Sequence, residues 1–153
     1  MFYYIFSENG LATYQQGVCV HKKELIDELG NEASKDIANY TLRYLSDVVL
    51  PFKRGTFFEY RTGLINICPM GRNCTLDERY LFDAFNKEHK VLEKLRDDLD
   101  AQFSEKYNVL VCFGGQVSVD IFMKGWDKTY CLQFLEGCDI VFFGDKVFKV
   151  MFD

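Results

Sequence analysis

Hydrophobic and polar residues alternate along the chain with two different periods, and the longer period predicts helices. Apolar residues recur at helical spacing over about 32–49, so a helix there would bury one face. A shorter helix is expected over 22–29. Another is expected to begin at Thr75, because Thr-Leu-Asp-Glu has the form of a capping box. Its buried face would contain Leu81, Phe85, Leu92, Leu95, Leu99 and Phe103.

Shorter apolar runs predict β-strands. Residues 56–61 and 64–68 flank Thr62-Gly63, which indicates a hairpin. The other expected strands lie near 2–6, 12–14, 109–113, 116–122 and 139–143. The run over 139–143 is continuously apolar, as is typical of a strand buried on both faces of an α/β sheet. The middle of the chain is therefore predicted to be α+β, with pieces of a parallel α/β core at both ends and the middle inserted between them.

Composition narrows the possible functions. The 153 residues carry a net charge of −5, which argues against broad binding to nucleic acid or membrane surfaces. No apolar run is long enough to span a membrane, and the first residues lack signal-peptide features. Six cysteines without CxxC spacing indicate reduced, mostly buried thiols in the cytosol, rather than disulfides or a zinc site.

Three arginines surround the predicted start of the helix at Thr75. Arg61 ends the first hairpin strand, Arg72 lies in the loop after the second, and Arg79 lies in the first helical turn. A bound phosphate would favour this grouping, because helix N-termini and guanidinium groups both attract anions. The alternative is that Arg79 pairs in solvent with Asp77, Glu78 or Asp83.

A second candidate group lies on the strand over 116–122. Its alternation places Gln116, Ser118 and Asp120 on one face. A hydroxyl and a carboxylate two residues apart can bind a sugar and its phosphate. An ordinary solvated sheet face would show the same pattern.

Two further residues are candidates near the end of the chain. Asp145 follows the predicted strand over 139–143, where ligands gather in open α/β sheets, so it is a candidate Mg²⁺ ligand or a turn residue. Lys128 is a candidate for neutralising a phosphate, or a surface lysine. His21 and His89 have no evident partner.

Several long motifs resemble those of eukaryotic phosphomannomutases, over about residues 2–146. They are Phe6-Ser-Glu-Asn-Gly-Leu, Arg54-Gly-Thr-Phe-Phe-Glu-Tyr-Arg-Thr-Gly, Pro69-Met-Gly-Arg-Asn-Cys, Asp77-Glu-Arg, Gly114-Gly-Gln-Val-Ser-Val-Asp-Ile-Phe, Gly125-Trp-Asp-Lys-Thr-Tyr-Cys-Leu and Phe142-Phe-Gly-Asp-Lys. The resemblance implies a haloacid-dehalogenase-like fold. An α+β cap over 20–124 would be inserted in a Rossmann-like core, of which 1–19 and 125–153 would be remnants.

The resemblance also implies an activity. The family interconverts mannose 6-phosphate and mannose 1-phosphate for GDP-mannose synthesis, with Mg²⁺, a hexose 1,6-bisphosphate activator, a nucleophilic aspartate and an acid/base aspartate. The implied roles are phosphate binding for Arg61, Arg72 and Arg79, and phosphate and sugar binding for Ser118 and Asp120. Lys128 would steady the phosphoryl group, and Asp145 would belong to the metal site. A cytoplasmic homodimer paired through the cap is also implied.

The sequence departs from the family pattern at the motifs that carry the catalytic residues. It contains no Asp-x-Asp-Gly-Thr motif, and no Gly-Gly-Asn-Asp segment follows Asp145. Residues 147–153 do not match the motifs. Without the nucleophile no covalent intermediate can form, so we expect this polypeptide to be inactive alone and its core strands to lack cover. The alternative function is a non-catalytic sugar-phosphate-binding or dimerising cap module.

Overall fold

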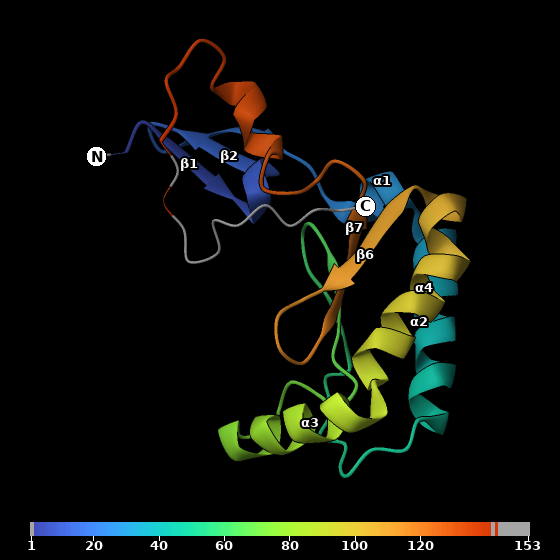
Figure 1. The fold of residues 1–153 in the computed structure, drawn as a ribbon. Helices are drawn as coiled ribbons and strands as arrows, with labels where there is room; N and C mark the ends of the chain where they lie inside the picture. The colour runs from blue at the N-terminus through green and yellow to red at the C-terminus, as the bar shows by residue number, and fades with distance from the viewer. Residues whose placement is uncertain (1, 142, 144–153) are drawn as a thin grey trace.

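The computed structural model describes residues 2–141 and 143, and within them the fold is mixed α/β (Figure 1). Four α-helices and two small antiparallel sheets make up this part of the chain. None of these helices is both long and apolar enough to cross a membrane.

The first sheet contains three strands near the N-terminus. They are β1 (Tyr4–Ser7), β2 (Ala12–Gln15) and β3 (Val18–Lys22), in the order β1-β2-β3. Gln16 and Gly17 join β2 to β3 with positive φ at both positions, as a tight hairpin with right-handed strand twist requires. The 3₁₀ helix η2 (Tyr130–Phe134) packs on this sheet, where His21 Nε2 and the Tyr130 hydroxyl are 3.0 Å apart.

The second sheet contains four strands. They are β4 (Phe58–Tyr60), β5 (Ile65–Ile67), β6 (Val109–Phe113) and β7 (Val119–Met123), in the order β4-β5-β7-β6. Every neighbouring pair is antiparallel. The hairpin predicted over 56–68 and the strand near 109–113 are confirmed, whereas the strand predicted over 116–122 begins later, at Val119.

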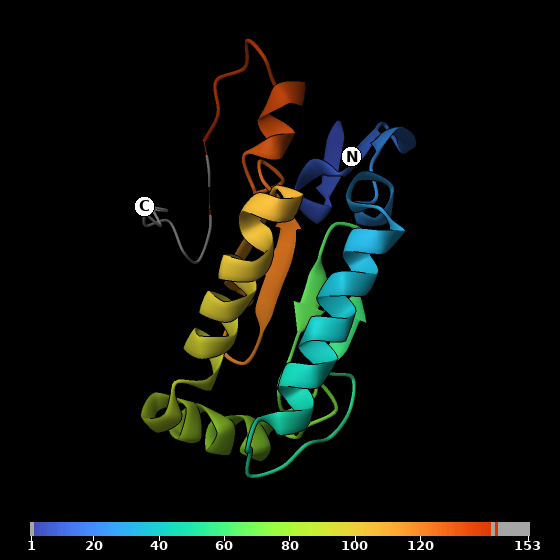
Figure 2. The same ribbon diagram turned by 90° about the vertical axis from the view of Figure 1, so that its right-hand side faces the viewer.

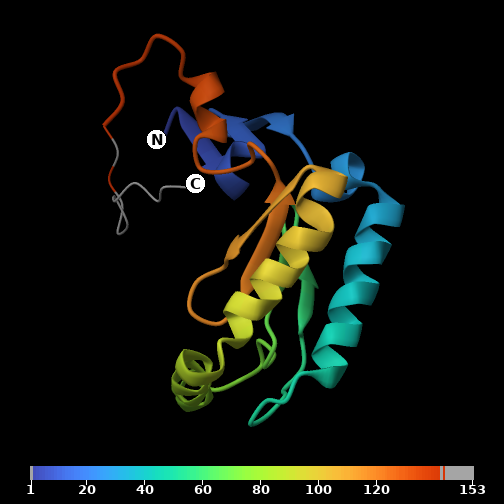
Figure 3. The same cartoon turned by 45° about the vertical axis from the view of Figure 1, so that its right-hand side comes forward.

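The four α-helices are α1 (Leu25–Leu29), α2 (Asn31–Asp47), α3 (Leu76–His89) and α4 (Val91–Tyr107). Of these, α2 and α4 cover one face of the second sheet (Figures 2 and 3). Figures 2 and 3 show α2 and α4 lying side by side against the sheet. The buried core between them contains Ile37, Leu45, Leu95, Leu99, Ile65, Ile67, Val119 and Ile121. Burial of these apolar side chains is the main force that holds helices and sheet together.

The predicted parallel core is not evident in the described residues. β1 pairs with β2 in the antiparallel direction, and residues 139–141 and 143 form no strand. The segment between β7 and residue 139 contains only the short 3₁₀ helix η2. Val141 and Phe143 are 77% and 88% exposed, so their apolar run has no packing partner within this part of the chain. The domain boundaries at 19/20 and 124/125 stay a prediction.

The long helix predicted from Thr75 is two helices. Lys90 separates α3 from α4 with a left-handed backbone (φ 56°), and Leu81, expected in the buried face, is 61% exposed. The Asn86 side chain explains the break. Its carbonyl oxygen accepts the Leu92 N–H (2.8 Å), which would otherwise lack a partner at the start of α4.

Replacing Lys90 by glycine should therefore stabilise the fold. A left-handed backbone costs a non-glycine residue about 1 kcal/mol, and the exposed Lys90–Glu93 pair (3.4 Å) returns little of it. We expect Lys90→Gly to raise the free energy of unfolding by about 0.5–1 kcal/mol in urea denaturation. The exposed helix-interior control, Lys94→Gly, should lower it by about 1 kcal/mol. Loss of stability in both variants would contradict the strain at Lys90.

Candidate functional site

A row of polar residues crosses the second sheet on the face opposite the helices. Glu59, Asn66, Asp120 and Cys112 are direct cross-strand partners on β4, β5, β7 and β6. In Figure 1, α2 and α4 lie to the right of this sheet, and α3 extends below it toward the other side. Directly paired residues share a face, so the register alone brings these four side chains together.

Asn66 is the centre of this row. Its side-chain nitrogen donates to Ser118 Oγ (3.0 Å) and to Asp120 Oδ1 (2.5 Å). Its oxygen accepts from Arg72 Nη1 (2.8 Å). Asn66 is only 2% exposed, so every polar atom of its amide needs such a partner. The amide therefore fixes three predicted site residues relative to one another.

Ser118 is less accessible than the sequence pattern predicts. Its side chain is 1% exposed, and its hydroxyl donates to the Gly114 carbonyl (2.7 Å) while accepting from Asn66. Gln116, expected on the same strand face, lies in the loop before β7.

Glu59 brings two of the predicted arginines to one point. A single carboxylate oxygen, Oε2, accepts from Arg61 Nε (2.9 Å) and Nη2 (2.6 Å). The same oxygen lies 3.4 Å from Arg72 Nε. Two guanidinium groups from separate stretches of chain therefore meet at one negatively charged atom.

The position of Arg72 depends on a close approach of two backbones. Gly71 has a φ of +91°, and a Cβ there would lie 2.2 Å from the Gly55 carbonyl oxygen. The neighbouring residues tie the two segments together, because Arg72 N–H donates to Thr56 O (3.1 Å) and Arg54 N–H donates to Met70 O (2.8 Å). Only glycine at position 71 permits this pairing.

Arg79 lies in the first turn of α3, as predicted, and the capping box at Thr75 is confirmed. Two of the three acidic residues proposed as its solvent partners are engaged elsewhere. Glu78 pairs with Arg54 (2.5 Å), and Asp83 pairs with Lys87 (2.7 Å). Among the described residues, no ion pair or side-chain hydrogen bond involves the Arg79 guanidinium.

The buried Cys68 thiol lies near the positive charges of both Arg72 and Arg79. Burial raises the pKa of Cys68, and the positive charges of Arg72 and Arg79 act in the opposite direction. Both guanidinium groups are therefore close enough to this thiol to act on it. Of the six cysteines, only Cys68 is buried, so the expectation of mostly buried thiols is wrong, although all six are free.

Burial also raises the pKa values of two residues in this row, Asp120 and Cys112. It raises the pKa of Asp120 despite the opposing effects of Asn66, Arg61 and Arg72, and Glu59 adds to the rise. Burial and the neighbouring Asp120 raise the pKa of Cys112 to about 11, so this thiol stays protonated at neutral pH. The backbone at Gly114 admits the Asp120 carboxylate, since a Cβ there would lie 2.4 Å from Asp120 Oδ1.

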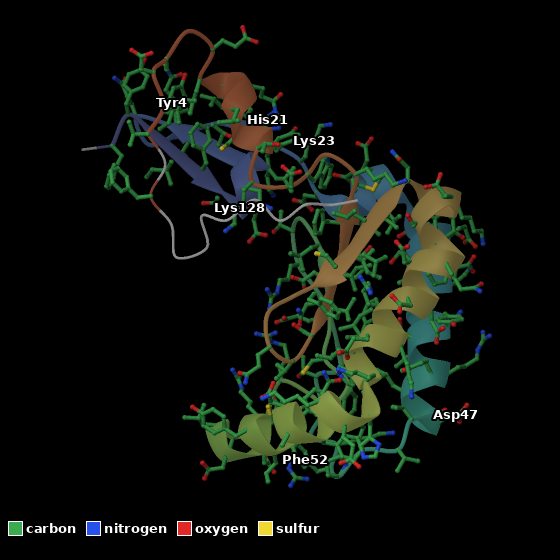
Figure 4. The ribbon with its side chains drawn as sticks, viewed as in Figure 1. Tyr4, His21, Lys23, Asp47, Phe52 and Lys128 are labelled. Atoms are coloured by element: carbon green, nitrogen blue, oxygen red, sulfur yellow. The ribbon has the colours of Figure 1, made fainter. Side chains whose placement is uncertain are left out.

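The two remaining predicted residues lie apart from this cluster. Lys128 is exposed in the turn between β7 and η2, and Figure 4 labels it in the half of the molecule that holds the three-stranded sheet. No hydrogen bond or ion pair among the described residues joins it to the arginines. Asp145 lies outside the described residues. Within residues 2–141 and 143, no group of three or more His, Cys, Asp or Glu side chains could hold a metal ion.

Two residues of the cluster, Glu59 and Asn66, are absent from the sequence prediction. Glu59 is two residues before Arg61, so strand alternation places both on one face. Asn66 is a lone amide between Ile65 and Ile67, and such a residue inside an apolar strand indicates a specific partner.

Comparison with known proteins agrees with the motifs on this sheet. A protein-family model, described as eukaryotic phosphomannomutase, matches residues 1–153, which is wider than the 2–146 predicted from the motifs. The chain belongs to the eukaryotic phosphomannomutase family. The phosphomannomutase of Drosophila melanogaster is 47% identical over 149 residues, covering 95% of this chain and 58% of that protein.

Relatives from distant lineages match to a similar extent. The Galdieria sulphuraria phosphomannomutase is 45% identical over 148 residues, covering 96% of this chain and 59% of its own length. The Solanum lycopersicum phosphomannomutase is 45% identical over 147 residues, covering 95% and 58%. The chain therefore spans a little under three fifths of the phosphomannomutases it matches.

The raised pKa of Asp120 makes a testable prediction about pH and stability. The folded chain holds the Asp120 proton more tightly than the unfolded chain does, so the contribution of Asp120 to stability falls as pH rises through its folded pKa. Asp120→Asn removes this titration. The free energy of unfolding of the variant, relative to the wild type, should therefore be greater at pH 7.5 than at pH 4.5 in urea denaturation. The exposed Asp100→Asn should show no such change, and a decrease for Asp120→Asn would contradict the burial argument.

Proposed function

We propose that this chain provides the sugar-phosphate-binding part of a phosphomannomutase, which interconverts mannose 6-phosphate and mannose 1-phosphate for GDP-mannose synthesis. Arg61, Arg72 and Arg79 would bind the phosphate that does not react, and Ser118 and Asp120 would bind phosphate and sugar. The observation that carries the proposal is the meeting of Arg61 and Arg72 at one carboxylate oxygen.

Guanidinium groups suit this task because each offers several donors in a fixed plane to the oxygens of a phosphate. Arg79 adds the start of a helix, where backbone N–H groups favour an anion. Asp120 is an acceptor for sugar hydroxyls beside these donors. Ser118 would donate to a phosphate only by turning its hydroxyl away from the Gly114 carbonyl, which it contacts in the free chain.

The remaining family roles are part of the proposal. Lys128 would steady the transferred phosphoryl group, and Mg²⁺ would bind at a site that includes Asp145, with a hexose 1,6-bisphosphate as activator. Among the described residues, no group of three or more His, Cys, Asp or Glu side chains offers an alternative metal site. The proposed setting is cytoplasmic. A homodimer through the cap is supported by exposed apolar residues on and after α2, namely Leu42 and Val49.

Binding without turnover is the second candidate function. The sequence contains no Asp-x-Asp-Gly-Thr motif to supply the nucleophile, whereas Glu59 and Asn66, which contact Arg61 and Arg72, are paired within one sheet. This polypeptide would then bind sugar phosphates, alone or paired with a second chain, without converting them.

Calorimetric titration with mannose 1-phosphate tests the binding proposal. We expect millimolar or tighter affinity, weakened at least tenfold by Arg61→Ala and by Arg79→Ala, because a charge-assisted hydrogen bond contributes about 1.5–3 kcal/mol. Arg43→Ala is the matched control, since Arg43 is an exposed arginine of α2 on the helix side of the sheet. A wild-type chain that binds no sugar phosphate would contradict the proposal.

A mutase assay separates the two candidate functions. We expect no conversion of mannose 1-phosphate by the 153-residue polypeptide, because the covalent route requires the nucleophilic aspartate. Conversion should appear in a fusion that adds the Asp-x-Asp-Gly-Thr region of a phosphomannomutase ahead of Met1. Turnover by the 153-residue polypeptide itself would refute the inactive module. A fusion that folds and binds substrate but remains inactive would favour it.

A further inference from the structure

Asn66 lies between the positive and the negative groups of the proposed site. Its carbonyl oxygen accepts from Arg72 Nη1 (2.8 Å), and its side-chain nitrogen donates to Asp120 Oδ1 (2.5 Å) and to Ser118 Oγ (3.0 Å). Asn66 is 2% exposed, whereas Arg72 and Asp120 are both partly exposed. A bound ligand would therefore meet Arg72 and Asp120 rather than Asn66 itself.

The orientation of the Asn66 amide is fixed by its partners. A guanidinium group has only donors and an ionised carboxylate has only acceptors, so the amide oxygen must face Arg72 and the nitrogen must face Asp120. A leucine has nearly the same shape but no polar atom. An ionised aspartate could accept from Arg72 but could not donate to Asp120. An amide at position 66 therefore joins a cation and an anion through one side chain.

The contacts of Asn66 use one atom of each charged partner and leave a second atom available. Within residues 2–141 and 143, no hydrogen bond or ion pair involves Arg72 Nη2 or Asp120 Oδ2. A phosphate oxygen could accept from Nη2, and a sugar hydroxyl could donate to Oδ2, while both contacts of Asn66 persist. Side chains that are held in place before binding lose less conformational freedom when the ligand arrives.

We propose that Asn66 is a positioning residue, which holds Arg72 for the phosphate and Asp120 for the sugar without contacting the ligand itself. This inference rests on the proposed function, since it concerns the same site. Arg61 is held differently, because both of its hydrogen bonds go to Glu59. The effect of Asn66 on phosphate affinity should therefore pass through Arg72 and not through Arg61.

A double-mutant cycle tests this route. Asn66→Leu keeps the approximate volume of the side chain and removes its three hydrogen bonds. The ligand is inorganic phosphate, which carries no sugar, and binding to the full chain is followed by ¹H–¹⁵N chemical-shift titration at pH 7.5. We expect Asn66→Leu to weaken binding about tenfold in the wild-type and Arg61→Ala backgrounds, but less than about twofold in the Arg72→Ala background.

A purely structural role makes a different prediction. If Asn66 only stabilised the sheet, its replacement would weaken phosphate binding by the same factor in all three backgrounds. That result, with phosphate bound by the wild type, would overturn this inference and leave the proposed function standing. Asn39→Leu is the matched control, because Asn39 is an exposed asparagine of α2, and it should leave the affinity unchanged in every background. A wild type that binds neither inorganic phosphate nor mannose 1-phosphate would overturn both proposals.

The contact of Asn66 with Asp120 has its own signature in the absence of ligand. Burial raises the pKa of Asp120, and the Asn66 hydrogen bond opposes that rise because it stabilises the ionised carboxylate. Loss of this donor should therefore raise the pKa of Asp120 further. The other charged or titratable groups that interact with Asp120 are Arg61, Arg72, Glu59 and Cys112. They are the same in the wild type and in Asn66→Leu.

Titration of the Asp120 carboxyl group, followed by ¹³C NMR in the full chain, measures this signature. We expect Asp120 to titrate at higher pH in Asn66→Leu than in the wild type, and at the wild-type pH in Asn39→Leu. Should Asn66→Leu fail to fold, Asn66→Ser gives the same comparison, because its shorter hydroxyl side chain cannot reach both partners. An unchanged pKa of Asp120 in a folded Asn66 variant would overturn this inference.

Discussion

The two faces of the four-stranded sheet are the constraint on which the rest of the structure depends. On the central strands, the residues that face α2 and α4 are apolar, whereas Asn66 of β5 and Asp120 of β7 lie on the opposite face. A shift of one residue in the pairing of β5 with β7 would bury Asp120 against the helices and expose Ile121. Packing of the apolar core therefore determines the strand register. That register in turn brings the polar side chains of the site together on the opposite face of the sheet.

The site is held together mainly by its own internal partners. Asn66 links Arg72 to Asp120, and Glu59 links Arg72 to Arg61, so positive and negative groups are fixed before any ligand arrives. Such preorganisation lowers the ordering that a ligand must bring about on binding. It also costs stability, since burial disfavours the charged form of Asp120. Functional sites commonly combine these two properties.

Local patterns in the sequence predicted the hairpin, the capping box and the helix over 32–49, because each depends on residues close together in the chain. The break at Lys90 was missed, since it depends on an Asn86 side chain that bonds beyond its own helix. The predicted parallel core is not evident in the described residues, because apolar runs such as 139–143 reveal burial potential but not their partners. The arginines were found from their motifs, while Glu59 and Asn66 required the pairing register.

The most direct test of this account is a crystal structure of the chain with mannose 1-phosphate bound. The account predicts phosphate oxygens about 3 Å from the guanidinium groups of Arg61, Arg72 and Arg79, on the face of the sheet opposite α2 and α4. The Glu59 carboxylate should then have given up at least one of its arginine contacts. A sugar phosphate bound elsewhere, with the contacts of Glu59 unchanged, would contradict the account.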